Sequence, residues 1–449
     1  MRRLGCLSKR LSSKISFFFV LMVDSFVFIL FFGCNRSPEP ILSPTVTNLP
    51  LTNPASSILT FTPSTLPIFT PSPTLSDTPE STLTPTPFVK PTSIVQESCV
   101  QVVSNLDSQL SFKGTLVVHN EDKDKTYFLN LENGQKRTFA TFSPQGRFSP
   151  QSWSWEYAFS PDGKWMAYGE IYLNETGSQI IEKQVHIIAA DGRRNYFPYW
   201  PNEKVDIVGW LNNDQLALYR AWGPEGEIIV LTPLTGEFIT FKPTVPSKLI
   251  TLWSFLPQYN STVDHVLYDV LGPGYEIWNL NSKQKVWEIQ YEPNSFVPYP
   301  KWSPSGNEIA FVLPEGRTQN LYRTDLIGNE KQVTFLEDSY DPPYSAVDQF
   351  YWSPDGNLIA VWLKIRNKEQ RNLALLDIRT QEIRNLCITD DGNGYDNFDN
   401  NFIVWNANSQ QFAISGTYEF NDTVIVDIAT NIAYLISENE RPIGWMTNE

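Results

Sequence analysis

Few side chains in this sequence have the types and spacing that enzymes use for covalent chemistry. The chain has three histidines, His119, His186 and His265, which fall in or beside separate apolar runs and share no spacing. It has no Gly-x-Ser-x-Gly, His-Glu-x-x-His or Cys-x-x-Cys motif and no glycine-rich phosphate loop. We therefore interpret the histidines as core or surface residues and expect no enzyme. A glycosidase-type pair of carboxylates needs no local motif, so a hydrolase or lyase stays the alternative.

Aromatic and acidic residues gather instead in long, irregular segments between the apolar runs. Function concentrates in such segments, and aromatic rings beside carboxylates suit sugars or cationic peptide segments. The candidate ligand-binding residues are Trp200, Trp222, Tyr340, Asp341, Tyr344, Tyr395, Asp396 and Asp399. The alternative is that these rings only pad the loops and that the acidic side chains are simply solvated.

One of these segments, residues 390–401, consists largely of Asp, Asn and Gly. Oxygen ligands at such close spacing can hold Ca²⁺. The segment does not fit the EF-hand loop, because its Gly and Glu positions do not match. A Ca²⁺ site and a plain polar loop are both open interpretations, and the sequence indicates no other cofactor.

The elements that position these loops repeat along the chain. Three clear copies read Phe-Ser-Pro-Asp-Gly at 159–163, Trp-Ser-Pro-Ser-Gly at 302–306 and Trp-Ser-Pro-Asp-Gly at 352–356. Pro and Gly suit a tight turn, and the Asp side chain can bond its own backbone. Each copy is followed by a short apolar run without alternation, which is typical of a strand buried on both faces.

Degenerate copies extend the repeat to the end of the chain. The repeat starts are Phe159, Trp210, Trp253, Trp302, Trp352, Trp405 and Trp445, separated by 40 to 53 residues. That period fits a four-stranded blade. Residues 115–141 supply three strands without an opening one, and residues 443–446 supply an opening strand with nothing after it. We therefore predict an all-β protein whose propeller of seven blades spans residues 99–449 and is closed by the C-terminal strand.

These motifs resemble the TolB-type, WD-repeat-like propeller repeat over roughly residues 100–449. The resemblance implies a β-propeller but no particular function, because propellers host many unrelated activities. The chain departs from TolB, since no α/β domain precedes the expected propeller and the repeat has seven units rather than six. Those departures argue against a role in the Tol system.

Residues 1–34 have the pattern of an export signal. A basic stretch is followed by the mostly apolar residues 15–32 and then by Gly33-Cys34. A small residue before Cys at the end of such a stretch resembles a bacterial lipobox, in which Cys34 would be lipidated. The alternative is an uncleaved membrane anchor. Both place the propeller outside the cell membrane, attached to its extracytoplasmic face as a bacterial lipoprotein or anchored protein.

Residues 35–98 form a tract rich in Pro, Thr and Ser that cannot bury a core, so we expect a disordered linker. Fully extended, it would reach on the order of 200 Å, at about 3.1 Å per residue. Beyond the linker and the leader, two cysteines remain, Cys99 and Cys387. In an oxidising compartment they can pair and join the incoming chain to the propeller rim, and two free thiols are the alternative.

The net charge of −15 makes nucleic acid and anionic membrane surfaces poor partners. In a propeller blade the turns that join strands one to two and three to four lie on one face. Here those turns are mostly short, and the connections on the other face are long and varied. We expect the long-loop face to bind or scaffold an extracytoplasmic protein without catalysis. A cell-envelope glycan is the alternative ligand.

Overall fold

The computed structural model describes most of the chain beyond the predicted linker. The described residues are 95–103, 112–120, 123, 125–139, 146–147, 157–173, 180–192, 195–196, 198, 205–220, 227–242, 258–270, 274–292, 297–315, 317–336, 344–368, 370–390, 403–415 and 422–448. The predicted leader, including Cys34, and nearly all of the predicted linker lie outside these ranges. Residues Thr86–Glu449 form one compact unit. Within the described ranges, no helix is long and apolar enough to cross a membrane.

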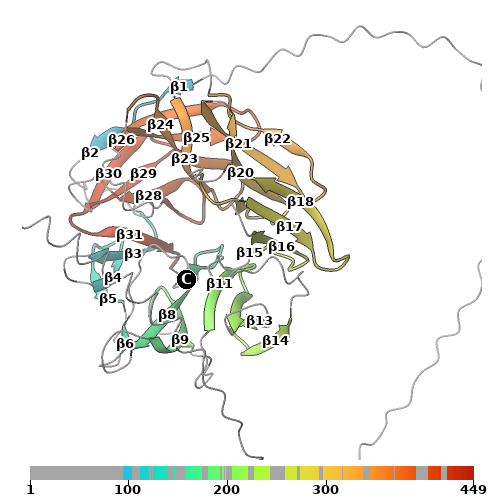
Figure 1. Cartoon of the computed structure of the whole chain (residues 1–449). Coiled ribbons are helices and arrows are strands. Elements are labelled where there is room, and N and C mark those ends of the chain that lie inside the picture. Colours follow the sequence, from blue (N-terminus) through green and yellow to red (C-terminus); the bar gives the residue numbers. More distant parts are fainter. Residues whose placement is uncertain are drawn as a thin grey trace, which may run out of the picture. The chain divides into compact units, whose positions relative to one another are not determined.

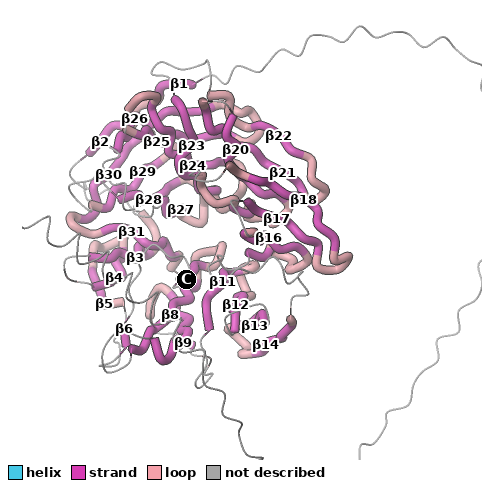
Figure 2. Tube along the Cα trace, viewed as in Figure 1, coloured by secondary structure: helices cyan, strands magenta, loops and turns pink. Residues whose placement is uncertain are grey.

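The described part of the chain is all-β, as predicted, and we group its successive strands in fours as blades 1 to 7 (Figures 1 and 2). Blades 5 and 6 share one sheet, because Gln319 and Ala346 form a parallel bridge between them. Blade 1 contains β31 (Arg441–Met446), β3 (Thr115–Asn120), β4 (Lys125–Asn130) and β5 (Lys136–Thr138). Blade 2 contains β7 (Tyr157–Phe159), β8 (Trp165–Leu173), β9 (Ile180–Ala189) and β10 (Asn195–Tyr196), with β6 (Gly146–Arg147) also paired to β8. Blade 3 contains β11 (Val205–Trp210), β12 (Leu216–Arg220), β13 (Glu227–Thr232) and β14 (Glu237–Phe241).

The remaining blades follow the same antiparallel order. Blade 4 contains β15 (Gln258–Tyr259), β16 (His265–Asp269), β17 (Gly274–Asn279) and β18 (Gln284–Gln290). Blade 5 contains β19 (Lys301–Trp302), β20 (Glu308–Glu315), β21 (Thr318–Asp325) and β22 (Glu330–Gln332). Blade 6 contains β23 (Tyr344–Trp352), β24 (Leu358–Ile365), β25 (Arg371–Asp377) and β26 (Ile383–Asp390). Blade 7 contains β27 (Ile403–Trp405), β28 (Gln411–Ser415), β29 (Thr423–Asp427) and β30 (Ile432–Ser437).

The hydrophobic core is divided into clusters that lie between successive blades. Each cluster combines apolar side chains from two neighbouring sheets, because both faces of the middle strands are buried. The clusters join blades 1 and 2 (Phe128, Met166), 2 and 3 (Ala167, Ile207), 3 and 4 (Tyr219, Val266), 4 and 5 (Ile277, Phe311), 5 and 6 (Val312, Val361), 6 and 7 (Trp362, Phe412), and 7 and 1 (Ile425, Leu116). The last of these clusters returns to the first blade, so the packing closes into a ring and the fold is a β-propeller.

The recurrent turn of the sequence owes its residue types to local hydrogen bonds. In blade 6 the Ser353 hydroxyl accepts the backbone N–H of Leu358 at 2.9 Å and donates to Asp355 Oδ1 at 2.6 Å. Gly356 follows at φ 71°, a value that favours glycine. Ser160 makes the same bonds in blade 2, to the N–H of Trp165 and to Asp162. The motif thus closes the link between the first and second strands of a blade.

The blade-opening tryptophans connect each blade to the one before it. The indole N–H of Trp352 donates to the carbonyl of Lys301 at 3.3 Å, and Trp405 donates to Tyr351 at 3.3 Å. The other bonds of this kind run from Trp210 to Ala158 and from Trp302 to Gln258, both at 3.1 Å. Every acceptor lies in the opening strand of the preceding blade. The bonds therefore give the ring a directional series of links, each contributing on the order of 1 kcal/mol.

Blade 4 corrects one predicted repeat start. Its opening aromatic residue is Tyr259 in β15, whereas Trp253 lies outside the described residues. The turn after Tyr259 has no Ser-Pro-x-Gly motif. Asn260 replaces the serine, and its Oδ1 accepts the backbone N–H groups of Asp264 and His265 at 3.1 and 3.0 Å. Val263 takes the glycine position at φ 58°. Different side chains thus form the same turn, and the sequence motif is lost.

The C-terminal strand closes blade 1, as predicted. β31 pairs antiparallel with β3, so that Thr115 lies opposite Met446 and His119 opposite Arg441. In Figure 1 the red β31 lies beside the blue-green β3. Thr447 continues to the next blade, where its N–H donates to the carbonyl of Gly163 at 2.9 Å. The end of the chain therefore stands where the other blades have a turn.

The N-terminal segment extends the outer edges of two blades. β1 (Val95–Glu97) pairs parallel with β26 of blade 6, and β2 (Gln101–Val103) pairs parallel with β30 of blade 7. Between them a disulfide joins Cys99 to Cys387, whose Cα atoms are 4.8 Å apart. The incoming chain is thus fastened to the rim, away from the opening strands.

Substitution at Gly114, which precedes β3, tests how tightly β31 closes blade 1. Gly114 has φ 103°, and an added Cβ would lie 2.4 Å from the carbonyl oxygen of Met446. Gly134, in the same blade, has φ 69° but nothing within 4 Å of an added Cβ. Both alanine variants add backbone strain of about 1–3 kcal/mol, and Gly114→Ala adds a steric cost of about 1–3 kcal/mol. We expect urea unfolding to show the larger loss for Gly114→Ala; equal losses would contradict a tight closure.

Turn carboxylates make the fold sensitive to acid. Partial burial alone would raise the pKa of Asp264, but hydrogen bonds from Thr262, Asn260 and His265 outweigh it and lower this pKa to about 2. A folded pKa below the unfolded value stabilises the protein above that unfolded value, about 3.9, and the contribution is lost as the pH falls toward 2. We expect Tm to fall over this range. Asp264→Asn should lower Tm at neutral pH and flatten its decline in acid; an unchanged decline would contradict this role.

Candidate functional site

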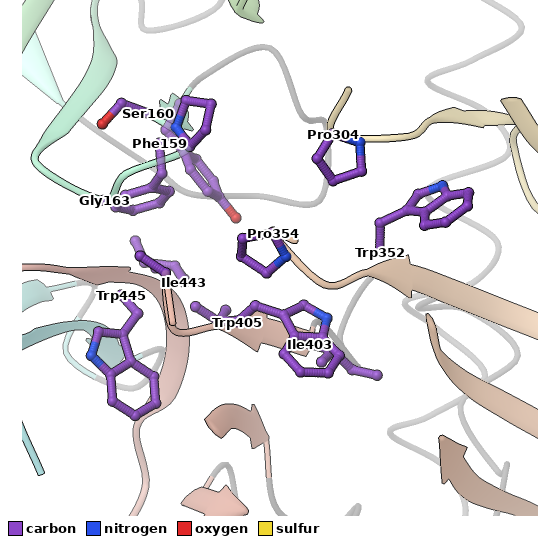
Figure 3. A pocket seen from close by; sticks show the side chains of 15 residues that line it. Phe159, Ser160, Gly163, Pro304, Trp352, Pro354, Ile403, Trp405, Ile443 and Trp445 are labelled. Atoms are coloured by element: carbon purple, nitrogen blue, oxygen red, sulfur yellow. The ribbon is translucent and has the colours of Figure 1, made fainter. Parts of the chain in front are cut away.

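A central pocket of about 400 Å³ opens among the first strands of blades 1, 2, 5, 6 and 7. Aromatic rings supply much of its wall, including Phe159, Trp352, Trp405 and Trp445. Prolines from three of the recurrent turns complete it, namely Pro161, Pro304 and Pro354. Figure 3 shows Pro304, Pro354, Trp405 and Ile443 around the same space. The lining therefore joins residues that are far apart in the sequence.

The way each blade opens explains why this pocket is apolar. Trp352 and Trp405 are half-buried, and their only polar groups donate to backbone carbonyls of the preceding blades. Trp445 donates to the carbonyl of Lys113 within its own blade, at 3.1 Å. The Ser160 hydroxyl is engaged within its own turn. Apart from the hydroxyls of Tyr157 and Ser160, the lining side chains thus offer apolar surface, which suits an apolar occupant.

Blade 2 contributes a ring that approaches the backbone of blade 1. The Phe159 side chain lies so close to Gly444 that an added Cβ there would come within 1.7 Å of Phe159 Cζ. Both residues line the pocket. Phe159 has no N–H to donate, so it makes the contact to the preceding blade by packing alone, and a glycine leaves room for it.

The turns on this face carry mostly negative charge. In the six turns that join first to second strands, the charged side chains are Asp162, Lys164, Asp214, Asp264 and Asp355. The only cation among them, Lys164, lies 3.5 Å from Asp162. Partial burial alone would raise the pKa of Asp355, but hydrogen bonds from Ser353, Asn357 and Ser409 lower it. The turn face therefore stays anionic at neutral pH.

The described pocket lining contains no His, Cys, Asp, Glu or Lys. Across the described ranges, no group of three or more His, Cys, Asp or Glu side chains is placed to hold a metal ion. The lining can therefore bind an apolar group by contact, and Tyr157 and Ser160 supply its side-chain hydroxyls.

The structure describes one of the predicted ligand-binding residues, Tyr344, and corrects it. Its side chain is 1% exposed, and its hydroxyl accepts hydrogen bonds from Asn372 and Asn385, each at 3.1 Å. Two neighbouring strands thus hold the ring in the core, so Tyr344 offers no surface to a ligand. The other candidates lie outside the described residues, namely Trp200, Trp222, Tyr340, Asp341, Tyr395, Asp396 and Asp399. Residues 391–401 of the candidate Ca²⁺ loop lie outside them as well.

The three histidines lie in β3, β9 and β16, strands of three different blades. His119 Nδ1 is 3.0 Å from Thr126 Oγ1. His186 stacks on Tyr168, with ring centroids 5.0 Å apart, and lies 3.1 Å from Glu170. His265 contacts Asp264 and Asn279. Each histidine thus has partners within its own blade, and the three do not converge on one site.

We expected the working face at the long loops, whereas the pocket lies beside the short turns of the repeat. The sequence did contain a pattern that marks the pocket residues, because each proline of the recurrent turn comes two residues after a blade-opening aromatic residue. What the repeat alone did not reveal is that these prolines and rings from five blades meet around one space.

No family model matches the sequence. Among solved structures, TolB from Acinetobacter baumannii is 15% identical, with a TM-score of 0.39 over 72% of this chain and 79% of that one. An oligogalacturonate lyase from Vibrio parahaemolyticus is 9% identical, with a TM-score of 0.45 over 73% and 87%. The Cps50 (Swd1) β-propeller domain of Myceliophteria thermophila is 14% identical, with a TM-score of 0.38 over 68% and 94%. At these identities the likeness concerns the fold alone, and the strand pairing of the described residues makes this chain a β-propeller protein.

Proposed function

We propose that this protein is a non-catalytic binding module, which takes an apolar side chain of an extracytoplasmic protein partner into its central pocket. The bound segment carries basic residues on either side of that apolar anchor. The observation that supports this most directly is an aromatic and proline-lined pocket of about 400 Å³, on a face whose first-to-second-strand turns carry four aspartates and one lysine.

The size and lining of the pocket favour a side chain over a large ligand. A space of about 400 Å³ lies in the lower part of the range for ligand sites. Burying one large apolar side chain there would contribute about 1.5–3 kcal/mol. Aromatic and proline surfaces also suit an extended, proline-containing segment, whose backbone is already ordered before it binds.

The charge of the turn face favours a cationic partner. The turns that join first to second strands contain four carboxylates and one lysine, and the whole chain has a net charge of −15. Opposite charges on the partner would raise the association rate and select against acidic segments. The electrostatic contribution to binding weakens as salt is added, whereas the contribution of the apolar contact does not.

The attachment of the N-terminal segment is compatible with a tethered receptor. β1 and β2 lie on the outer strands of blades 6 and 7, whereas the pocket lies among the opening strands. A linker and a lipidated Cys34 ahead of β1 would therefore hold the propeller without covering the pocket. Export, lipidation and an extracytoplasmic location belong to this proposal.

A short peptide with a central Phe-Pro flanked by lysines tests the proposal on the compact unit Thr86–Glu449. Trp352, Trp405 and Trp445 line the pocket, so binding should change the tryptophan fluorescence in a saturable way. Ala407 also lines the pocket, and Ala407→Trp should fill it and weaken binding roughly tenfold or more. Asn307→Trp adds the same ring to an exposed turn position outside the lining and should leave the affinity unchanged.

A charge-reversed peptide completes the experiment. With glutamates in place of the lysines, we expect no saturable signal at low salt, and added salt should weaken binding of the lysine peptide. Equal binding of the two peptides, or an unchanged affinity of Ala407→Trp, would overturn the proposed function.

A further inference from the structure

The first described residues form a strap that crosses the outer edges of two blades. We use the word strap for residues 95–103, which contain β1, Cys99 and β2. β1 lies along the outer strand of blade 6 and β2 along that of blade 7, each in parallel (Figure 1). The disulfide from Cys99 to Cys387 lies between the two strands. The strap therefore joins two blades at their rims, and one covalent bond fastens it in the middle.

Apart from this bond, the strap is held mainly by backbone hydrogen bonds. The N–H groups of Ser98 and Val100 donate to carbonyls of β26 at 3.0 and 3.1 Å. Cys99 and Val102 are exposed, Val102 at 69%. Val100 and Val103 pack against the core from partly buried positions. A segment with few buried apolar contacts and edge hydrogen bonds opens more easily than the core of a protein.

Cys387 is held by the blade rather than by the strap. The pairing of β25 with β26 shifts its register beside this residue. Cys387 has φ 58°, which residues other than glycine adopt rarely, and its N–H donates to Asn385 Oδ1 at 2.9 Å. The Asn385 amide in turn donates to the hydroxyl of the buried Tyr344 at 3.1 Å. Irregularities of this kind re-aim side chains, and here Cys387 is presented to the incoming chain.

The disulfide lies at the surface of the propeller. Cys99 and Cys387 are both exposed residues. Thiol–disulfide exchange needs access of an attacking thiolate to one of the two sulfur atoms, and exposed disulfides exchange more readily than buried ones. Access, a firmly held Cys387 and a weakly held strap thus occur together at one bond.

We propose that this disulfide is a thiol-sensitive clasp, which a dithiol reductant opens to release the strap from the rims of blades 6 and 7. A thiolate of the reductant attacks one sulfur of the bond and forms a mixed disulfide. The second thiol of the reductant then closes its own disulfide. Two electrons and two protons pass from the dithiol to the protein, and Cys99 and Cys387 become thiols.

Opening the clasp separates a part that moves from a part that stays. Cys387 remains in place, because its backbone is bonded through Asn385 to the core. Cys99 belongs to the strap and loses the covalent bond that opposes its departure. β1 and β2 are then held by three residue pairs each. We expect both strands to detach frequently while the ring of blades stays closed through β31 and β3.

Alkylation tests whether the bond opens in the folded protein. Thr86–Glu449 is treated with dithiothreitol without denaturant, quenched with iodoacetamide and weighed by mass spectrometry. We expect both cysteines to be labelled, at a rate within about tenfold of that for an unstructured disulfide peptide. Labelling that requires urea would overturn the proposal, because the disulfide would then be an inaccessible structural bond.

Hydrogen exchange tests whether the strap is released. After reduction, the backbone amides of residues 95–103 should lose protection by about tenfold or more. The amides of β31 serve as the internal control, since all six of its residues are buried and should stay protected. A strap that keeps its protection, or a β31 that loses its own as well, would contradict a local clasp.

Two variants separate the bond from the substitution. Cys99→Ser removes the disulfide and should show the exchange of the reduced protein without any reductant. Val102→Ser places a serine at an exposed strap position and keeps the disulfide, so it should retain the protection. Equal exchange in the two variants would overturn the clasp. These measurements use no pocket ligand, so failure of the proposed function and failure of this proposal are distinguishable.

Discussion

The pairing of β31 with β3 is the contact on which the remaining packing depends. It joins the C-terminal strand to the three earlier strands of blade 1, which contributes to the core clusters with blade 2 and with blade 7. Because each blade buries both of its faces against neighbours, a ring opened at blade 1 would expose apolar surface on two sides. The tryptophan links around the ring run only from one blade to the next, so they cannot substitute for the missing contact. Closure therefore couples the stability of distant blades.

The central pocket arises from the same residues that hold the blades together. Trp352 and Trp405 use their indole N–H groups to bond the preceding blade and also line the pocket. Pro354 belongs to the turn that Ser353 closes. The pocket wall is thus rigid, because moving one of these side chains would also disturb an interface between blades. A rigid apolar wall lowers the ordering cost of binding. It also means that ligand preference and fold stability cannot vary independently at these positions.

Local chemistry explains what the sequence could and could not predict. The Ser-Pro-x-Gly turns are specified by bonds within a few residues, so the repeat and the closing strand were readable. Tyr259 was missed because Asn260 and Val263 form the same turn with other side chains, and a positive φ at valine leaves no sequence signal. Tyr344 was misassigned because its partners, Asn372 and Asn385, come from other strands. The pocket was not predicted because it depends on how the turns of separate blades converge, which only ring closure decides.

The disulfide between Cys99 and Cys387 determines where mechanical tension would act. A pull on the chain ahead of Val95 would first load the three residue pairs between β1 and β26. It would then reach the disulfide and pass into the outer strand of blade 6. The segment directly after Cys99, which includes β2, would be bypassed while that bond is intact. The force would thus enter the propeller at the rim of blade 6 rather than through β2 or the strands of blade 1.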